Sequence, residues 1–335
     1  MIQIQELKNL LKNPLRIGIT THYKPDGDAL GSSLGLSLLL KSLGHEVLFI
    51  SPSDYPPFFN WLPDAQEIMV YPMEKEKAES FLIAADLIFC LDFNHIKRIQ
   101  ELGVFIEKLS CPKIMMDHHL DPQGFEDLAF WDTEASSTCQ MVFRFILEFG
   151  FLHQVNASIA TCLYTGIMTD SGSFRFPRTS PELHRITADL IELGADNVEI
   201  QERVNGTQSL NRLKFLGYCI ENKLVVWKEF NTAYFFINQE ELEKFEIETG
   251  ETDGIVNYAL SIDFVVMAVF FVERGEKIKI SFRSKGNFPV NELASKHFSG
   301  GGHLNASGGE SEMSLEETIK KFHSILPEYH HLLVT

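Results

Sequence analysis

The first 120 residues of this chain alternate short apolar segments with amphipathic ones, and this alternation restricts the possible folds more than any other feature. Four segments have the length and apolar content of buried strands: residues 15–22, 47–51, 87–93 and 113–119. Residues 29–44 and 95–109 have the apolar spacing expected of helices. Strands separated by helices predict an α/β domain with a mostly parallel sheet, in which ligands bind at the carboxyl ends of the strands.

The rest of the chain changes from helical to strand-like segments. Helices are expected first and strands after them: residues 137–150, 156–170 and 181–194, then 224–230, 232–237, 264–274 and 277–284. A chain of 335 residues also exceeds the usual size of a single hydrophobic core. We therefore expect a first domain over residues 1–195, a connecting segment over 196–212 and a smaller α/β domain over 213–335.

The charge of the chain restricts its partners. Its 46 Asp and Glu residues outnumber its 29 Lys and Arg residues, so the formal net charge is −17. This charge repels a long nucleic-acid duplex, whereas a small anionic ligand held by metal ions is not excluded. No apolar run approaches the roughly 20 residues of a membrane helix, and the five cysteines form no C-x-x-C pair. We expect a cytoplasmic protein with reduced thiols that does not bind a membrane.

Acidic and imidazole side chains gather where the predicted strands and helices end. Eight of them stand at such positions: His22, Asp26, Asp28, Asp92, Asp117, His118, His119 and Asp170. Because the carboxyl ends of parallel strands meet at one edge of the sheet, we expect these side chains to converge. At least four carboxylates in one cavity repel one another strongly unless cations are present.

Two divalent ions would cancel four carboxylate charges. Oxygen-rich ligands with two imidazoles suit manganese better than magnesium, and they do not resemble a zinc thiolate site. Two metal ions about 3.5–4 Å apart are the general apparatus for displacement at phosphorus. The residues therefore predict hydrolysis of a phosphate ester.

Simpler interpretations of the same residues remain open at this point. Asp28 could cap a helix that begins at Ala29. Adjacent strand residues point to opposite faces, so one of His118 and His119 could be packed in the core. Asp92 and Asp170 would be unremarkable if each were considered alone.

Five motifs resemble those of a known family, and they extend over nearly the whole chain: HYKPDGDALGS (22–32), LDFN (91–94), DHHLDP (117–122), TDSGSFRF (169–176) and SGGGHLNASGG (299–309). In this order they resemble the motifs of DHH-family phosphoesterases that carry the DHH-associated C-terminal domain. Within that family, the chain is similar to the oligoribonuclease and 3′-phosphoadenosine-5′-phosphate phosphatase type.

The resemblance implies a ligand set for two manganese ions: His22 and Asp26 for one, Asp28, His118 and Asp170 for the other, and Asp92 for both. Magnesium remains possible in place of manganese. The resemblance also implies that His119 lies beside the reacting phosphate, as a proton donor or hydrogen-bond partner. Asp117 would orient this loop from behind the ligands.

In the second domain, residues 281–284 resemble the family's substrate strand, in which Arg283 grips a phosphate bidentately. Backbone amides of Gly300, Gly301 and Gly302 would approach phosphate oxygens, and His303 would bond to phosphate or stack on a base. From the residues alone, Arg283 could also be a solvated strand residue and the glycines an ordinary loop.

These features together predict a two-domain phosphoesterase with its active site in the cleft between the domains. Its substrates would be short oligoribonucleotides, linear dinucleotides such as pApA, or a nucleoside bisphosphate. A pyrophosphatase or exopolyphosphatase is the alternative within the enzyme class, and a nucleotide sensor with a degenerate metal site is the alternative outside it. A homodimer is also plausible.

Overall fold

The computed structural model describes residues 3–206, 208–248 and 250–334, and the chain forms two compact units. The first unit comprises Met1–Thr207 and the second comprises Gln208–Thr335. Each unit has its own six-stranded sheet and its own buried apolar clusters. The first unit ends within the segment 196–212 that the sequence assigns as the connection.

The sheet of the first unit is entirely parallel. Its strands lie in the order β3-β2-β1-β4-β5-β6. Their bounds are Arg16–Thr21 (β1), Glu46–Ser51 (β2), Met69–Val70 (β3), Leu87–Leu91 (β4), Lys113–Asp117 (β5) and Leu128–Trp131 (β6). The chain builds outward from β1 to β3, then crosses to β4 and builds outward on the other side. The order therefore reverses between β1 and β4, and ligands of such sheets bind at this reversal.

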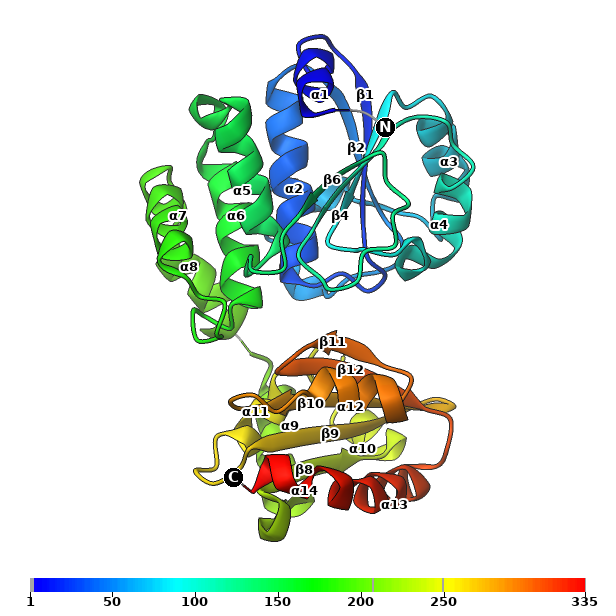
Figure 1. The fold of residues 1–335 in the computed structure, drawn as a ribbon, viewed down its shortest axis with the longest axis vertical. Coiled ribbons are helices and arrows are strands. Elements are labelled where there is room, and N and C mark those ends of the chain that lie inside the picture. The colour runs from blue at the N-terminus through cyan, green and yellow to red at the C-terminus, as the bar shows by residue number, and fades with distance from the viewer. Residues whose placement is uncertain (1–2, 207, 249, 335) are drawn as a thin grey trace. The chain divides into compact units, whose positions relative to one another are not determined.

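Helices cover both faces of this sheet, with α2, α5 and α6 on one face and α3 and α4 on the other (Figure 1). The helices of the first unit are Ile4–Leu10 (α1), Gly27–Ser42 (α2), Lys75–Ile83 (α3), Gln100–Ile106 (α4), Thr138–Phe149 (α5), Ala157–Asp170 (α6), Pro181–Glu192 (α7) and Asn197–Gln201 (α8). Short 3₁₀ turns span Pro57–Phe59, Ala65–Glu67, Ile96–Ile99 and Leu152–Gln154, and a π-helical turn spans Glu202–Gly206.

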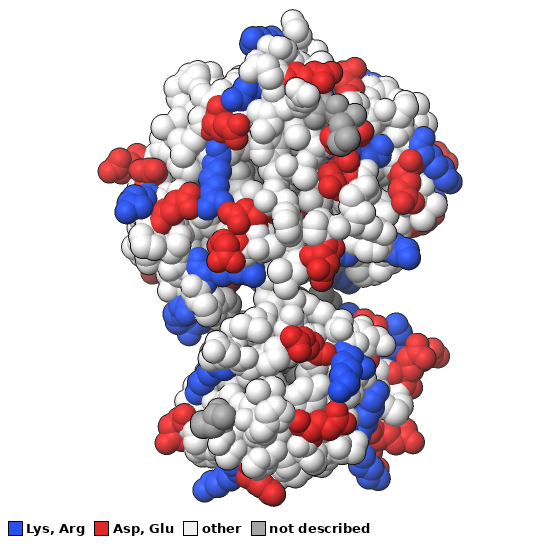
Figure 2. Space-filling model, in the orientation of Figure 1, with Lys and Arg blue, Asp and Glu red and all other residues white. Residues whose placement is uncertain are grey.

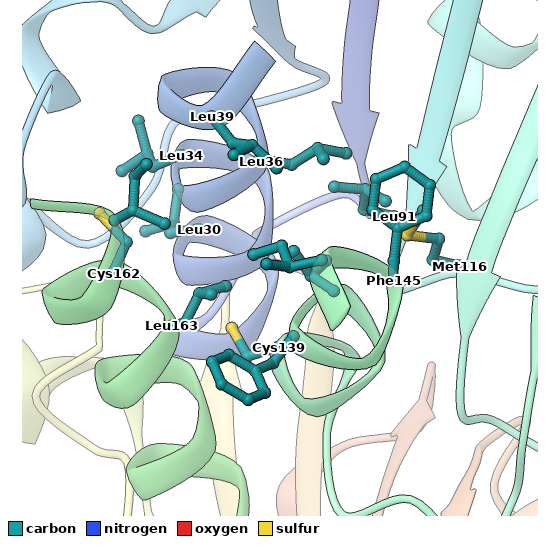
Figure 3. Packing of buried hydrophobic residues seen from close by; sticks show 14 of the residues in the cluster. Leu30, Leu34, Leu36, Leu39, Leu91, Met116, Cys139, Phe145, Cys162 and Leu163 are labelled. Atoms are coloured by element: carbon teal, nitrogen blue, oxygen red, sulfur yellow. The ribbon is translucent and has the colours of Figure 1, made fainter. Parts of the chain in front are cut away.

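Helix α2 lies at the centre of the first unit and packs against the sheet, α5 and α6, while Phe145 of α5 itself packs against Leu91 and Met116 of the sheet (Figure 3). Glycines spaced four residues apart line its contact with α6. A Cβ atom added to Gly31 would lie 2.4 Å from the carbonyl oxygen of Cys162, and one added to Gly35 would lie 2.8 Å from Leu163 Cδ2. These glycines therefore permit the close approach of the two helices.

The second unit has a mixed sheet in the order β11-β12-β10-β9-β8-β7, in which only the β8 and β9 pair is parallel among the described pairings. Its strands are Leu224–Trp227 (β7), Thr232–Ile237 (β8), Met267–Arg274 (β9), Lys277–Ser284 (β10), Gly301–His303 (β11) and Ala306–Ser311 (β12). Its helices are Leu210–Tyr218 (α9), Gln239–Lys244 (α10), Ile255–Leu260 (α11), Val290–His297 (α12), Leu315–Ile325 (α13) and His330–Leu333 (α14). Cys219–Lys223 is π-helical, and Lys228–Phe230 and Leu326–Tyr329 are 3₁₀ turns.

The predicted fold class is confirmed: a parallel α/β unit is followed by a smaller α/β unit. Differences occur at the sheet edges and at the interior strand β12, which has no counterpart among the predicted segments. The glycine-rich segment expected as a loop contains the edge strand β11, although glycine is depleted in strands. The short edge strands β3 and β6 also have no counterpart among the predicted segments. Among the described residues, no helix combines the length and apolar character needed to cross a membrane.

Candidate active site

Two of the predicted site residues stand at the reversal of strand order. His22 directly follows β1, and Asp92 directly follows β4. Asp92 has a left-handed backbone, with φ of 63°, and its amide donates to the carbonyl oxygen of Met116 at 3.0 Å. Asp tolerates this conformation better than most residues. The turn therefore brings the Asp92 carboxylate to the end of the sheet immediately after the strand stops.

The loop after β1 delivers two more carboxylates. Asp26 is the N-cap of α2, and its side chain accepts from the backbone amides of Asp28 and Ala29 at 3.0 and 3.1 Å. The alternative in which Asp28 caps this helix is therefore wrong, because Asp26 has that role and Asp28 is turned inward. The Asp26 side chain is 63% exposed, whereas that of Asp28 is 1% exposed. Asp26 thus lies at the rim and Asp28 in the interior of the site.

The candidate ligand atoms form two adjoining groups that share Asp92. In the first group, Nε2 of His22 lies 3.9 Å from Asp26 Oδ1 and 3.4 Å from Asp92 Oδ2. In the second group, Nε2 of His118 lies at these distances from three carboxylate oxygens: 3.9 Å from Asp28 Oδ2, 3.6 Å from Asp92 Oδ1 and 3.4 Å from Asp170 Oδ2. The fold therefore brings together the six side chains that the sequence analysis assigned to metal ions.

These spacings and the ring orientations fit metal ions better than direct hydrogen bonds. Separations of 3.4–3.9 Å are long for hydrogen bonds. Two ligand atoms at about 2.1 Å from one octahedral ion lie about 3.0 Å apart when adjacent and about 4.2 Å apart when opposite. The Nδ1 atoms of His22 and His118 donate to the carbonyl oxygens of Tyr23 and Ala135 at 3.0 and 3.3 Å. This tautomer directs Nε2 of each ring toward the carboxylates.

The electrostatics of the group also favour bound cations. Burial lowers the pKa of His22, but Asp26 and Asp92 outweigh burial and raise it to about 10. His118 behaves in the same way beside Asp92, Asp170 and Asp28, with a pKa of about 10. Burial, together with the negative charges of its neighbours, raises the pKa of Asp170 to about 7 and that of Asp28 well above its usual range. The site is thus a region of strongly negative potential, which divalent cations would neutralise.

His119 has a different hydrogen-bond partner from His118. Its Nδ1 donates to Asp117 Oδ1 at 2.8 Å, and the Asp117 side chain is completely buried. The His119 side chain is 18% exposed. Nδ1 of His119 also lies 3.7 Å from Asp92 Oδ1, which places the ring against the metal-ligand group. The alternative in which one histidine of the pair belongs to the apolar core is therefore wrong.

Sequence analysis missed the residues that hold these loops in place. The N-terminus of α5 contacts two of the predicted ligands: Thr138 Oγ1 donates to Asp92 Oδ1, and the amides of Thr138 and Cys139 donate to the Asp28 carboxylate. The Asn94 side-chain amide donates to the carbonyl oxygen of Leu120, and Nε1 of Trp131 donates to that of His119 at 2.7 Å. Asn94 is the last residue of the LDFN motif, so this motif could have indicated its role in the sequence analysis.

The predicted substrate residues of the second unit share one row of its sheet. Arg283 of β10 pairs with Ala306 of β12, and Ala306 pairs in turn with His303 of β11. Directly paired residues project from the same face, so Arg283 and His303 lie on one face about 10 Å apart. The arginine is thereby aligned with the histidine across the intervening strand.

Two of the three glycines in this region have a packing role. A Cβ atom on Gly300 would lie 2.0 Å from the carbonyl oxygen of Gly308, and one on Gly302 would lie 2.6 Å from that of Ala306. Gly302 also has φ of 141°, which disfavours other residues. A Cβ on Gly301 would meet no heavy atom of the described residues within 4 Å. Packing therefore does not require a glycine at position 301, unlike positions 300 and 302.

Comparisons with known proteins agree with this arrangement. The profile of the DHH family N-terminal domain matches residues 16–167, and that of the DHHA1 domain matches residues 230–328. A Thermus thermophilus protein named bifunctional oligoribonuclease and PAP phosphatase NrnA is 32% identical over 91% of this chain and 86% of its own length. A Bacillus subtilis protein of the same name is 32% identical over 86% of each chain. The crystal structure of an exopolyphosphatase-related protein from Bacteroides fragilis is 40% identical, with a TM-score of 0.95 over 99% of this chain and 97% of that one.

Proposed function

This chain belongs to the DHH family of phosphoesterases, and from that premise we propose that it is a manganese-dependent hydrolase of short oligoribonucleotides, linear dinucleotides such as pApA, and 3′-phosphoadenosine-5′-phosphate. The family makes it a phosphate-ester hydrolase. The names of its relatives support the substrate class. The proposal depends mainly on one observation: six candidate ligand side chains form two adjoining groups, and Asp92 belongs to both.

We assign one ion to His22, Asp26 and Asp92, whose ligand atoms all lie within 4.8 Å of one another. The second ion belongs to the other group that shares Asp92, and its ligands are Asp28, Asp92, His118 and Asp170. Hard oxygen ligands with two imidazoles favour manganese over magnesium. When bound, a pair of divalent ions supplies charge neutralisation for phosphate oxygens and lowers the pKa of water.

The chain's own residues add orientation and proton transfer. Because Nδ1 of His119 donates to Asp117, its Nε2 is the atom at which a proton is held for the leaving oxygen of the substrate. Asp117 fixes the orientation of the ring, and its negative charge stabilises the doubly protonated ring that carries this proton. His119 thus acts on the substrate, while Asp117 acts through His119.

The second unit carries groups suited to binding phosphate. We propose that Arg283 holds a terminal phosphate and that His303, in the same row, contacts phosphate or base. The backbone amide of Gly301 can approach a phosphate oxygen because no side chain covers it.

Initial rates on a panel of substrates test the proposal. Purified protein is incubated with Mn²⁺ and equal concentrations of pApA, an RNA pentamer, cyclic di-AMP, 3′-phosphoadenosine-5′-phosphate and pyrophosphate. We expect Mn²⁺-dependent release of mononucleotides from pApA and the pentamer, and of AMP from 3′-phosphoadenosine-5′-phosphate. Asp92→Asn should lower these rates at least about a hundredfold, because it removes the carboxylate common to both ion groups.

Asp189→Asn is the matched control, since Asp189 is an exposed residue of α7 and should leave the rates unchanged. Hydrolysis of pyrophosphate alone would replace the proposal with the phosphoanhydride hydrolase that the Bacteroides fragilis relative's name suggests. Tight nucleotide binding without turnover of any substrate would instead identify a sensor. Wild-type rates in Asp92→Asn would refute the assigned metal site.

A further inference from the structure

The N-terminus of α5 meets the proposed metal ligands through one residue, Thr138. Its hydroxyl donates to Asp92 Oδ1 at 2.9 Å, and its backbone amide donates to Asp28 Oδ2 at 2.6 Å. We propose that Thr138 is a positioning residue that fixes the Asp92 carboxylate in the orientation needed to bridge two cations. The inference rests on the proposed function, because it concerns the same pair of ions.

The hydrogen bond from Thr138 leaves the bridging capacity of Asp92 intact. A carboxylate oxygen has two lone pairs, and the threonine hydroxyl uses one of those on Oδ1. The second lone pair of Oδ1 and both pairs of Oδ2 remain for cations. Oδ1 lies 3.6 Å from His118 Nε2, and Oδ2 lies 3.4 Å from His22 Nε2. The hydroxyl therefore holds the carboxylate so that each oxygen faces a different histidine.

The same turn of helix holds Asp28. Its Oδ2 accepts from the Thr138 amide, and its Oδ1 accepts from the Cys139 amide at 2.9 Å. These amides lie in the first turn of a twelve-residue helix, whose N-terminal partial positive charge favours a carboxylate. Asp28 is thus held through backbone atoms, which a substitution of the Thr138 side chain leaves in place. The side chain itself acts on Asp92.

Threonine suits this task for a second reason. Its side chain is completely buried, and a β-branched side chain is restricted in its first torsion angle. The hydroxyl is therefore directed at Asp92 with little entropy to lose when the ions bind. The N-cap function of the helix belongs to the neighbouring Ser137, whose side chain accepts from the Gln140 amide at 3.1 Å. Replacement of the Thr138 side chain therefore leaves the cap intact.

Thr138→Val and Thr138→Ser separate the hydroxyl from the shape of the side chain. Valine retains the volume and removes the donor, whereas serine retains the donor and removes a methyl group. We expect Thr138→Val to weaken Mn²⁺ binding by about 10- to 100-fold, measured with the metal alone by electron paramagnetic resonance of unbound Mn²⁺. At saturating Mn²⁺, kcat for pApA should fall about tenfold with little change in KM, because substrate contacts are unaffected. Thr138→Ser should remain within about threefold of wild type.

Thr187→Val is the matched control, because Thr187 is also a buried threonine and its hydroxyl donates within α7 to the carbonyl oxygen of Leu183 at 2.7 Å. It should bind Mn²⁺ as wild type does. A double-mutant cycle provides a second measurement: in the Asp92→Asn background, Thr138→Val should have little further effect on Mn²⁺ affinity. Thr138→Ala replaces Thr138→Val in every arm if the latter does not fold.

The outcomes distinguish this inference from the proposed function. Wild-type Mn²⁺ affinity and kcat in Thr138→Val would overturn the positioning role while the proposed function stands. Equal impairment of Thr138→Ser and Thr138→Val would also overturn it, because the hydroxyl would then not be the active feature. If the wild-type protein binds no Mn²⁺ and hydrolyses no member of the panel, the proposed function fails and this inference fails with it.

Discussion

His119 differs from the other two imidazoles of the site in the partner of its Nδ1 atom. His22 and His118 donate to backbone carbonyls, whereas His119 donates to the buried carboxylate of Asp117. A backbone carbonyl orients a neutral ring, while a carboxylate also stabilises the positive charge that follows protonation. The first arrangement suits a metal ligand, and the second suits a group that gains and loses a proton.

We predict that Asp117→Asn lowers kcat for pApA about a hundredfold or more. An asparagine amide removes the negative charge that stabilises the protonated ring, so His119 stays neutral, and a neutral imidazole is a much weaker proton donor to the leaving oxygen. Mn²⁺ affinity should change little, since Asp117 is not among the proposed ligands. The measurement is kcat at saturating Mn²⁺, together with the Mn²⁺ titration.

His119→Gln is the companion variant. If Asp117 acts through His119, then Asp117→Asn should lower kcat less than about threefold in the His119→Gln background. Two independent losses that multiply would contradict the pairing. A large loss of Mn²⁺ affinity in Asp117→Asn alone would instead make Asp117 part of the metal site.

Sequence analysis could find the site residues that lie in short local motifs, but not those that reach the site only through tertiary packing. Most of the proposed ligand residues follow strand ends within short motifs, and Asp170 ends a helix, so chain order and fold class together predicted that they meet at one edge. Thr138 is separated from Asp92 by 46 residues and from Asp28 by 110. Its sequence context resembles an ordinary helix start, which was expected near residue 137. Its contact with the site depends on the packing of α5 against α2, and nothing local in the sequence specifies that packing.

At the scale of elements, the geometry of the site depends on how closely α6 approaches α2 and α5. Asp28 stands on α2 and Asp170 at the end of α6, so the separation of these helices sets the separation of the two carboxylates. Gly166 of α6 lies at the contact. A Cβ atom there would be 2.2 Å from Cys139 Sγ and 2.9 Å from Asp28 Oδ1.

Gly166→Ala should therefore destabilise the first unit by about 1–3 kcal/mol, because the added methyl group forces the helices apart. It should also weaken Mn²⁺ binding, since Asp28 is displaced. Urea unfolding and Mn²⁺ titration measure the two effects.

The matched control is Gly217→Ala on the exposed side of α9, where an added Cβ meets no described atom within 4 Å. This substitution should be neutral or stabilise by up to about 1 kcal/mol, because alanine favours the helix. Equal effects of the two substitutions would contradict the close-contact argument.

Elements with a strong apolar pattern were predictable, whereas the edge strands and the glycine-containing strand β12 were not. Strands β4 and β5 are buried along their whole length, and their continuous apolar runs reveal them. Strand β6 alternates half-buried and exposed residues over four positions, which is too short for a distinct pattern. Strand β11 consists of Gly301–His303 and forms through pairing with β12, so its backbone bonds override its poor intrinsic preference.

At the scale of the molecule, charge opposes the binding of polyanions. The formal net charge is −17, and two divalent ions would cancel only four of these negative charges. Acidic side chains lie beside the basic ones on the visible face of both units (Figure 2). An enzyme that binds long nucleic acid through six to ten phosphate contacts loses roughly 10³–10⁵ in affinity between 50 and 200 mM salt. A short substrate makes fewer such contacts.

We therefore predict that kcat/KM for pApA stays within about threefold, or rises, between 50 and 200 mM KCl, because salt also screens the repulsion between the acidic protein and its substrate. Under the same conditions, a 40-base-pair RNA duplex should be hydrolysed at least about a hundredfold more slowly than an RNA pentamer, since repulsion grows with the number of phosphates that approach the protein. Initial rates at constant free Mn²⁺ measure both quantities, and potassium acetate in place of KCl controls for a specific effect of chloride. A tenfold or greater fall in kcat/KM for pApA with salt, or equal rates on duplex and pentamer, would show that a local basic groove outweighs the net charge. Selection of short substrates would then have to come from the shape of the binding site alone.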